Sequence, residues 1–478
     1  MKKYNLKKYD LIVIGTGSGM NYIGSILEEN PDFKIAVIDK DEPGGICLTR
    51  GCIPSKLLLY PAELIRTIGT AQKFGIDVEL KNVDFNYIME RMRSLISEDI
   101  GSIRIGLSSD PNVDYYHDVA EFVSAYTMKV GDKTITSKMI FLCTGSKTII
   151  PKIKGLEEAG YLTSDTILEM AKLPASIAII GGGYIAAEYG HFFSSMGSKV
   201  TIIGRNKQYI PEEEPEISML AKRDMSGFMD IVTGYEVEEV QTTAVGKKKV
   251  TARGEGNKVD FIVDEILVAS GRGPTHDILH PEIGGIETDA KGWIVVNEYL
   301  ETTQPGVWAF GDANGKYLFK HVANFESRVV FNNAIMKKKI KIDYHAVPYA
   351  VFSYPEIASV GMGEKEALEK YGQTNLLIGF QKYEDTAKGH AMDVKDYFVK
   401  VILENNTRRI LGAHIIGPYA SILIQEVVNL MYTEQENPDP IIQGMHIHPA
   451  LSEVVQKAFY SLVPPEHYHH LLGHMGLE

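Results

Sequence analysis

The chain of 478 residues has room for about three domains at roughly 150 residues each. It carries 49 basic and 62 acidic side chains, a net charge of −13, which argues against a nucleic-acid partner because phosphates attract basic surfaces. No stretch approaches the roughly 20 apolar residues that cross a membrane, and the apolar run at 11–14 is too short for a signal peptide. We therefore expect a cytoplasmic protein that binds neither nucleic acid nor membrane.

A first nucleotide-binding pattern opens the chain, in YDLIVIGTGSGMNYIGSIL. An apolar run of strand length leads into Gly15, Gly17 and Gly19, followed by a helix-like stretch. Such a turn directs free backbone N–H groups at a pyrophosphate. The next apolar run ends at Asp39, where a carboxylate can hold a ribose hydroxyl. Met20 stands where the third glycine is usual, so this motif alone is weak evidence.

Three cysteines are too few for a disulfide framework, yet Cys47 and Cys52 lie five residues apart in GGICLTRGCIPSK. In a reducing compartment such a disulfide is usually catalytic or redox-sensing. Pro54 suits the first turn of a helix, which would put Cys52 at the helix N-terminus, where the dipole favours a thiolate. Lys56 follows one turn later on the same face. The spacing fits no common zinc pattern, so we expect no metal.

The second nucleotide-binding pattern is complete. In SIAIIGGGYIAAE, Gly181, Gly183 and Ala186 match the G-x-G-x-x-A form. Two such motifs favour two dinucleotides, one passing electrons to the other, over one working site beside a decayed duplicate.

The strand after the second motif carries information on the coenzyme. It ends at Gly204, followed by Arg205 and Lys207, whereas a strand that binds NAD usually ends in an acid. Two cations are available for the 2′-phosphate of NADP, so we favour NADP over NAD. The alternative is that both are simply exposed charges.

The end of the chain holds an acid–base candidate in HIHPALSE. His448 precedes Pro449 at a predicted helix start, and Glu453 follows closely. A carboxylate on one ring nitrogen fixes the tautomer of a histidine that works as base and acid. Four later histidines predict a flexible or interface tail rather than a metal site; they are His467, His469, His470 and His474.

The order of these features resembles the two-cysteine, flavin-dependent pyridine nucleotide–disulfide oxidoreductases, over about Tyr9 to Leu462. The strongest markers are C-x4-C followed by Pro-Ser-Lys, and HPALSE. IGTGSG, KHVANFESRVV, LGAHIIG and IHPALSEVV resemble the mycothione reductase branch, whereas CIPSK and HxHPxLSE also resemble the dihydrolipoamide dehydrogenase branch. The mycothione reductase start also lacks the third glycine.

The resemblance implies an α/β fold with two Rossmann-like domains and a C-terminal α+β dimerisation domain. An FAD-binding domain would comprise 1–152 and 274–347, an NAD(P)-binding domain 153–273, and the dimerisation domain 348–478. It also implies FAD and NADP or NAD as cofactors, and a homodimer in which His448 acts across the interface.

Residue roles follow from the resemblance too. Cys52 would be the thiol beside the flavin and Cys47 the thiol that meets the substrate, while Lys56 would pair with Glu188 near the flavin. Tyr184 would cover the face where nicotinamide docks, unless it is an ordinary packed aromatic. The remaining residues expected to contact a cofactor are Gly44, Gly45, Thr144, Gly145, Gly271, Arg272, Gly311 and Asp312.

Three functions remain open. The first is reduction of a small thiol disulfide, with electrons passing from NADPH through FAD and the cysteine pair. The second is dihydrolipoamide dehydrogenase, a component of 2-oxo acid dehydrogenase complexes, in which electrons end on NAD. The third is a flavin redox sensor without turnover. We set aside mercuric reductase and high-molecular-weight thioredoxin reductase, because both need a C-terminal redox pair and no cysteine follows Cys143, which we expect in the core.

Overall fold

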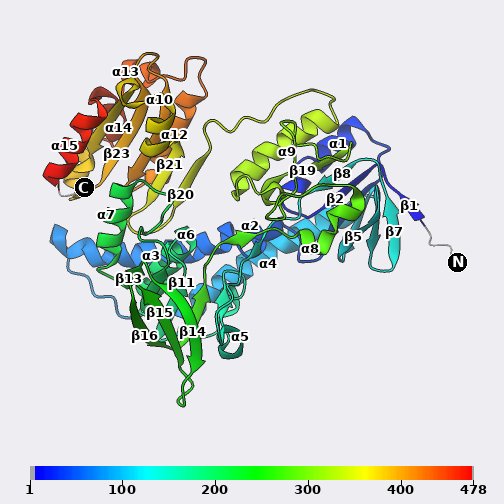
Figure 1. Ribbon diagram of the computed structural model, residues 1–478, viewed down its shortest axis with the longest axis horizontal. Helices are drawn as coiled ribbons and strands as arrows, with labels where there is room; N and C mark the ends of the chain where they lie inside the picture. The colour runs from blue at the N-terminus through cyan, green and yellow to red at the C-terminus, as the bar shows by residue number, and fades with distance from the viewer. Residues whose placement is uncertain (1–5, 476–478) are drawn as a thin grey trace.

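The computed structural model describes residues 6–475, which form three regions, each built on a five-stranded sheet (Figure 1). The first sheet is entirely parallel, and its apolar runs are buried on both faces, as parallel sheets require. In spatial order its strands are β19 (Val307–Ala309), β8 (Ile140–Leu142), β2 (Leu11–Ile14), β3 (Ile35–Asp39) and β4 (Val113–His117).

The two faces of the first sheet have different covers. Helices α1 (Ile23–Glu29) and α9 (Lys320–Ala334) pack on the face that carries Leu11 and Val13. A smaller sheet packs on the opposite face; it consists of β1 (Leu6–Lys8), β7 (Lys133–Thr136), β6 (Thr127–Val130) and β5 (Ala120–Ser124). Segments before residue 149 and after residue 306 thus share one core.

The second region repeats the strand–turn–helix plan. Its parallel sheet has the order β10 (Leu162–Thr163), β17 (Glu265–Val268), β11 (Ser176–Ile180), β12 (Lys199–Gly204) and β13 (Asp230–Thr233). Helix α6 (Tyr184–Met196) begins directly after the glycine turn, whereas the first turn leads into a short 3-10 turn, Ser18–Met20, before α1. Glycine and asparagine are poor helix formers, which accounts for the delay at Gly19 and Asn21. An antiparallel sheet completes the region, from β14 (Glu236–Thr242), β15 (Lys248–Gly254) and β16 (Asn257–Val263).

The third region is an antiparallel sheet covered by helices. Its strands are β20 (Pro348–Val351), β21 (Ile357–Gly361), β24 (Ile410–Ile416), β23 (Phe398–Glu404) and β22 (Leu376–Lys382). Helices α12 (Ala420–Met431) and α14 (Ser452–Tyr460) pack on one face. Helices α3 (Cys52–Thr70) and α4 (Phe85–Ser109) pack together and run across the middle of the molecule (Figure 1).

A buried ion cluster joins the second and third regions. The Lys400 side chain has no exposed surface, and its Nζ lies 2.5, 2.7 and 2.7 Å from carboxylate oxygens of Glu214, Glu216 and Glu364. Glu216 belongs to α7 (Pro215–Met225), Glu364 to α10 (Glu364–Tyr371). These three carboxylates are close enough together to hold a cation, and the Lys400 ammonium lies among them.

Two local expectations are wrong. The helix after His448 begins at Ser452 rather than at Pro449, because the Glu453 carboxylate accepts the N–H of Ala450 and leaves this turn outside the helix. For the histidine-rich end, expected to be a flexible or an interface tail, the flexible alternative is wrong and the interface alternative stays a prediction. This end forms α15 (Pro465–Met475), in which fully buried Tyr468 donates to Glu216 Oε1 at 2.6 Å. The His474 side chain lies outside the described residues.

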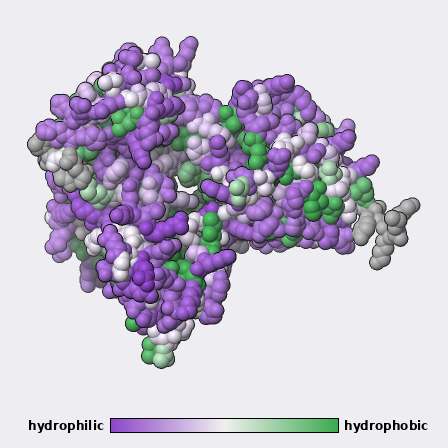
Figure 2. Space-filling view, viewed as in Figure 1, coloured by the Kyte–Doolittle hydropathy of each residue, from purple (hydrophilic) through white to green (hydrophobic). Residues whose placement is uncertain are grey.

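The visible surface is mainly hydrophilic, and hydrophobic residues appear on it as small separate spots (Figure 2). Within residues 6–475, no helix combines the length and apolar character of a membrane span.

Candidate functional site

The two cysteines lie at the junction of two helices. Cys47 is on α2 (Gly45–Thr49), and Cys52 is the first residue of α3, where the sequence predicted it. Both are present as thiols. A hydrogen bond from Cys47 is the main reason that the pKa of Cys52 falls to about 7; Lys56 lowers it further, against burial. The same hydrogen bond and burial raise the pKa of Cys47 far above its usual value. The pair therefore divides into a thiolate and a hydrogen-bond donor.

The expected pairing of Lys56 with Glu188 is present. Lys56 Nζ lies 2.8 Å from Glu188 Oε2, and Glu188 is almost fully buried. The backbone N–H of Phe352 also donates to Glu188 Oε1 at 3.1 Å, and Lys56 Nζ lies 4.5 Å from the centre of the Phe352 ring. Phe352 was not found from the sequence, because it is distant in the chain and carries no motif.

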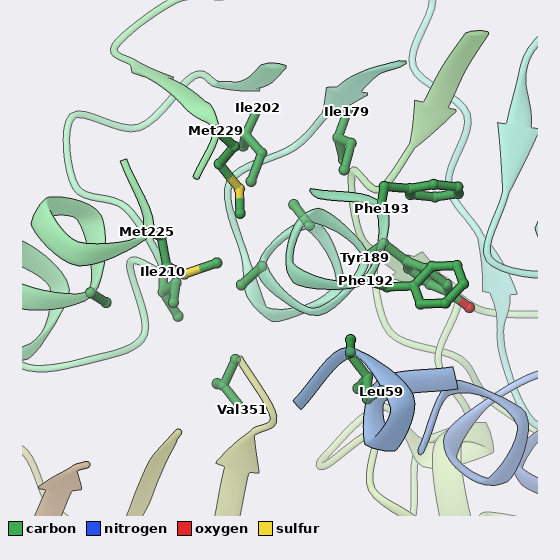
Figure 3. Packing of buried hydrophobic residues seen from close by; sticks show 14 of the residues in the cluster. Leu59, Ile179, Tyr189, Phe192, Phe193, Ile202, Ile210, Met225, Met229 and Val351 are labelled. Carbon is green, nitrogen blue, oxygen red and sulfur yellow. The ribbon is translucent and has the colours of Figure 1, made fainter. Parts of the chain in front are cut away.

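Packing holds Glu188 in place. Its helix, α6, is surrounded by side chains of four other elements: Leu59 of α3, Ile179 of β11, Ile202 of β12 and Val351 of β20 (Figure 3). Tyr189, Phe192 and Phe193 of α6 lie together on the side of the helix that faces Ile179 and Leu59 (Figure 3). The carboxylate that pairs with Lys56 is thus fixed where all three regions meet.

A cavity of about 900 Å³ surrounds the cysteines. Most of the residues expected at the site line it. They are Gly15, Gly17, Asp39, Gly44, Gly45, Cys47, Cys52, Lys56, Thr144, Gly145, Tyr184, Glu188, Arg272, Gly311 and Asp312.

The first glycine turn is fixed by an acid at the end of the neighbouring strand. Asp39 Oδ2 accepts the N–H of Thr16 at 2.8 Å and its hydroxyl at 2.5 Å, and the Thr16 hydroxyl accepts the N–H of Gly44 at 3.0 Å. Asp39 was expected to bind a ribose. That contact stays a prediction; in the structure Asp39 orders the turn, and Thr16, which the sequence gave no reason to select, links the two loops.

This region fits a bound dinucleotide because backbone rather than side chains lines it. Gly45 has φ +69°, and a Cβ there would lie 2.5 Å from the Cα of Gly17. At Gly15, with φ +102°, a Cβ would lie 2.2 Å from the carbonyl oxygen of Cys143. Only glycine fits at both positions. FAD would lie along these loops, with its pyrophosphate at the turn.

A polar network forms part of the cavity wall. Ser146 bonds to Asp312, and Arg272 Nε donates to Ser146 Oγ at 2.7 Å. Gly311 N donates to the buried carboxylate of Glu326 at 2.5 Å. Burial raises the pKa of Asp312 above its usual value. Arg272, Gly311 and Asp312 were expected here; Ser146 and Glu326 were not.

Several predicted residues lie away from this cavity. Gly19 packs between β2 and the end of β8, since a Cβ there would lie 2.9 Å from Cys143 Sγ. The half-buried Cys143, by contrast, packs against the core, where it was expected, and also lines the cavity. The others outside the cavity lining are Gly181, Gly183, Arg205, Lys207, Gly271, His448 and Glu453.

The expected acid–base pair forms, but at a distance from the thiols of its own chain. His448 Nδ1 lies 3.0 Å from Glu453 Oε1, and the His448 side chain is 70% exposed. The interaction lowers the pKa of Glu453, which keeps a negative charge beside the ring. In one subunit this pair is accessible to another molecule rather than to Cys47.

Comparisons with known proteins agree with this geometry. Residues 9–329 match the family model described as pyridine nucleotide-disulphide oxidoreductase, and residues 347–459 match its dimerisation domain, which supports a homodimer. Mycothione reductase of Mycobacterium tuberculosis is 35% identical, over 96% of this chain and 100% of the relative. Dihydrolipoyl dehydrogenase of Chlamydia trachomatis is 32% identical, over 96% and 98%.

A solved structure shares the whole architecture. The Cu(II) complex of the HOCl-induced flavoprotein disulfide reductase RclA from Escherichia coli superimposes with a TM-score of 0.83 at 27% identity, over 95% of this chain and 99% of that one. The matches, the paired cysteines and the dinucleotide turns agree. The chain belongs to the pyridine nucleotide–disulfide oxidoreductases, flavoenzymes that use FAD and NAD(P)H.

Proposed function

We propose that the protein reduces a small thiol disulfide with NADPH. FAD would carry the two electrons of the NADPH hydride to the Cys47–Cys52 disulfide, and the resulting thiols would reduce the substrate. The observation that carries the choice of NADPH is the end of β12, where no acid stands and two cations follow.

The packing at this strand end supports the proposal. A Cβ at Gly204 would lie 3.2 Å from the Cα of Gly182, so any side chain at this position would be in tight contact with the glycine turn. Arg205 and Lys207 follow on the surface. Lys207 has one distant acidic neighbour, Glu255 at 3.9 Å. Both cations are therefore available for a 2′-phosphate.

The thiol chemistry divides between the two cysteines. Cys52 has the lower pKa and begins α3, which suits the thiol that exchanges electrons with the flavin. Cys47 would attack the substrate disulfide after losing its proton to a base. We propose that the His448–Glu453 pair is this base and acts across a homodimer interface on the cysteines of the other subunit.

Rapid mixing without oxygen tests the coenzyme and the thiolate together. NADPH should reduce the bound flavin much faster than NADH does, and a long-wavelength thiolate–flavin charge-transfer band should follow. Because the pKa of Cys52 is lowered to about 7, the band should be present above about pH 7 and fade below it. No turnover of any low-molecular-weight disulfide with NADPH would disprove the proposal.

A second candidate is dihydrolipoamide dehydrogenase. It is favoured by full-length similarity to dihydrolipoyl dehydrogenases and by the motifs CIPSK and HIHPALSE. It requires reduction of NAD by dihydrolipoamide, and a faster reaction of the flavin with NADH than with NADPH. That result would mean that Arg205 and Lys207 are surface charges without a ligand.

A further inference from the structure

Lys320 is a cation in the cofactor cavity without an acidic partner. It is the first residue of α9 and lines the cavity together with Cys47 and Cys52. Among the described residues, no carboxylate oxygen lies within 4.0 Å of its Nζ. Burial lowers the pKa of Lys320, and negative charge on the thiols opposes this effect. A partly buried ammonium without an acidic partner is costly, so an anion that forms beside it would be stabilised.

Neutral groups hold this ammonium in position. Lys320 Nζ donates to Ser18 Oγ at 2.9 Å, and Ser18 Oγ donates to Asn324 Oδ1 at 2.9 Å. Asn21 Nδ2 donates to the same oxygen at 2.9 Å. These contacts fix the amine without neutralising it. The N-terminus of the 15-residue helix α9 adds its own positive end at the same place.

The other three lysines of the cavity lining are paired with acids, Lys40 with Asp41 at 2.8 Å and Lys147 with Asp277 at 2.5 Å. Lys56 is already neutralised by Glu188 at 2.8 Å, so this pair contributes little net charge. Reduction of the Cys47–Cys52 disulfide by one hydride equivalent breaks the S–S bond and leaves one thiol and one thiolate. The site therefore gains one negative charge at each reduction. Of the four lysines that line the cavity, Lys320 is the one with no carboxylate partner among the described residues, and its charge can offset the thiolate.

We propose that Lys320 is a positioning residue, whose ammonium stabilises the thiolate that reduction creates at the cysteine pair. The inference rests on the redox role proposed for Cys47 and Cys52. Other titratable or charged groups surround the thiols. They are Arg50 and Lys56 from α2 and α3 and the turn between them, Tyr184 and Glu188 from α6, Cys143 after β8, Asp312 after β19, and His321 and Glu326 from α9.

The test is the pH dependence of the charge-transfer band in the two-electron-reduced holoenzyme. In Lys320→Met the midpoint should rise by about one pH unit, since a nearby opposite charge shifts a pKa by about 1–3. Lys320→Arg, which keeps the charge, should keep the wild-type midpoint. Lys316→Met is the matched control, because Lys316 is exposed and lies outside the cavity lining. Lys320→Gln serves as a second neutral variant if Lys320→Met is unstable.

The outcomes separate the possible roles. An unchanged midpoint in both neutral variants would overturn the inference. So would a loss of FAD from these variants with an unchanged midpoint in the molecules that retain it, because Lys320 would then bind the pyrophosphate instead. Absence of the band from the wild-type protein at every pH would overturn the proposed function, and this inference with it.

Discussion

The two glycine-rich turns begin from nearly the same sequence pattern but differ in their surroundings. Gly15 and Gly17 line the large cavity, and Asp39 orders their turn through Thr16. Gly181 and Gly183 lie outside that cavity, and their strand partner ends in a glycine.

This difference matches the proposed roles, in which one motif serves two kinds of cofactor. The turn of Gly15 and Gly17, here called the enclosing turn, lies in the cavity wall, which suits a group that stays bound during turnover. The turn of Gly181 and Gly183, here called the open turn, lies outside that cavity, which suits a coenzyme that enters and leaves in each cycle. On this view, the surroundings of the glycines, rather than the glycines, decide how long a dinucleotide remains.

The largest expected effect comes from removing Cys47, which should stop reduction of the substrate without affecting reduction of the flavin by NADPH. Cys47→Ala should reduce disulfide turnover by about 1,000-fold or more, because the attacking sulfur is lost. NADPH should still reduce the flavin at nearly the wild-type rate, since the open turn is unaffected. Steady-state assays and rapid mixing measure the two steps. Equal losses in both would show that the cysteine pair and the coenzyme site are not independent.

A second change should break the enclosing turn alone. Gly45→Val would place a Cβ 2.5 Å from the Cα of Gly17 at a φ of +69°, so the two loops would have to separate. Strain of about 1–3 kcal/mol at such a backbone, added to the clash, should lower the FAD content of the purified protein by about tenfold. The ratio of flavin to protein absorbance measures it.

The matched control for this change is Gly24→Val. Gly24 lies in α1, and a Cβ there would have no neighbour within 4 Å. This variant should keep its FAD. Full FAD content in Gly45→Val would mean that the close approach of the two loops is not required to hold the cofactor.

The sequence could predict local features of both glycine-rich regions. Apolar runs that end at glycines predicted β2, β11 and β12, and a run that ends at Asp39 predicted β3, because strand burial is a local pattern. The C-x4-C spacing with Pro54 predicted the helix that begins at Cys52. Such features depend on neighbours within a few residues.

Contacts between distant segments could not be predicted in the same way. Lys320 and Ser18 are 302 positions apart, and Arg272 and Ser146 are 126 apart. The docking of α15 depends on a bond between Tyr468 and Glu216, 252 positions earlier. Because no periodicity in the sequence relates such residues, the cavity wall and the packing of α15 could be described only from the structure.

The open turn gives the next prediction. In the double variant Arg205→Ala/Lys207→Ala, KM for NADPH should rise about tenfold to a hundredfold, because hydrogen bonds to charged groups contribute about 1.5–3 kcal/mol. KM for NADH should stay nearly constant, since NADH lacks the 2′-phosphate. Steady-state kinetics with both coenzymes measures the ratio, and Lys199→Ala, an exposed lysine at the other end of β12, is the control. An equal rise for both coenzymes would argue against phosphate recognition.

The smallest expected effect concerns an acid beside the open turn. A Cβ at Gly183 would lie 3.9 Å from Glu212 Oε2, so this carboxylate is close to the N-terminus of α6, where a pyrophosphate would bind. Like charges about 4 Å apart repel by about 1 kcal/mol in a watery site. Glu212→Gln should therefore lower KM for both coenzymes by about two- to fivefold.

Because the pyrophosphate is common to NADPH and NADH, Glu212→Gln should leave the preference between them unchanged. Glu369→Gln is the control, since Glu369 is an exposed acid on α10, in another region of the chain. If Glu212→Gln improved NADH alone, Glu212 would lie at the adenosine ribose instead and would itself select the coenzyme. The coenzyme preference would then depend on an acid outside β12, and the sequence at the end of that strand could not have predicted it.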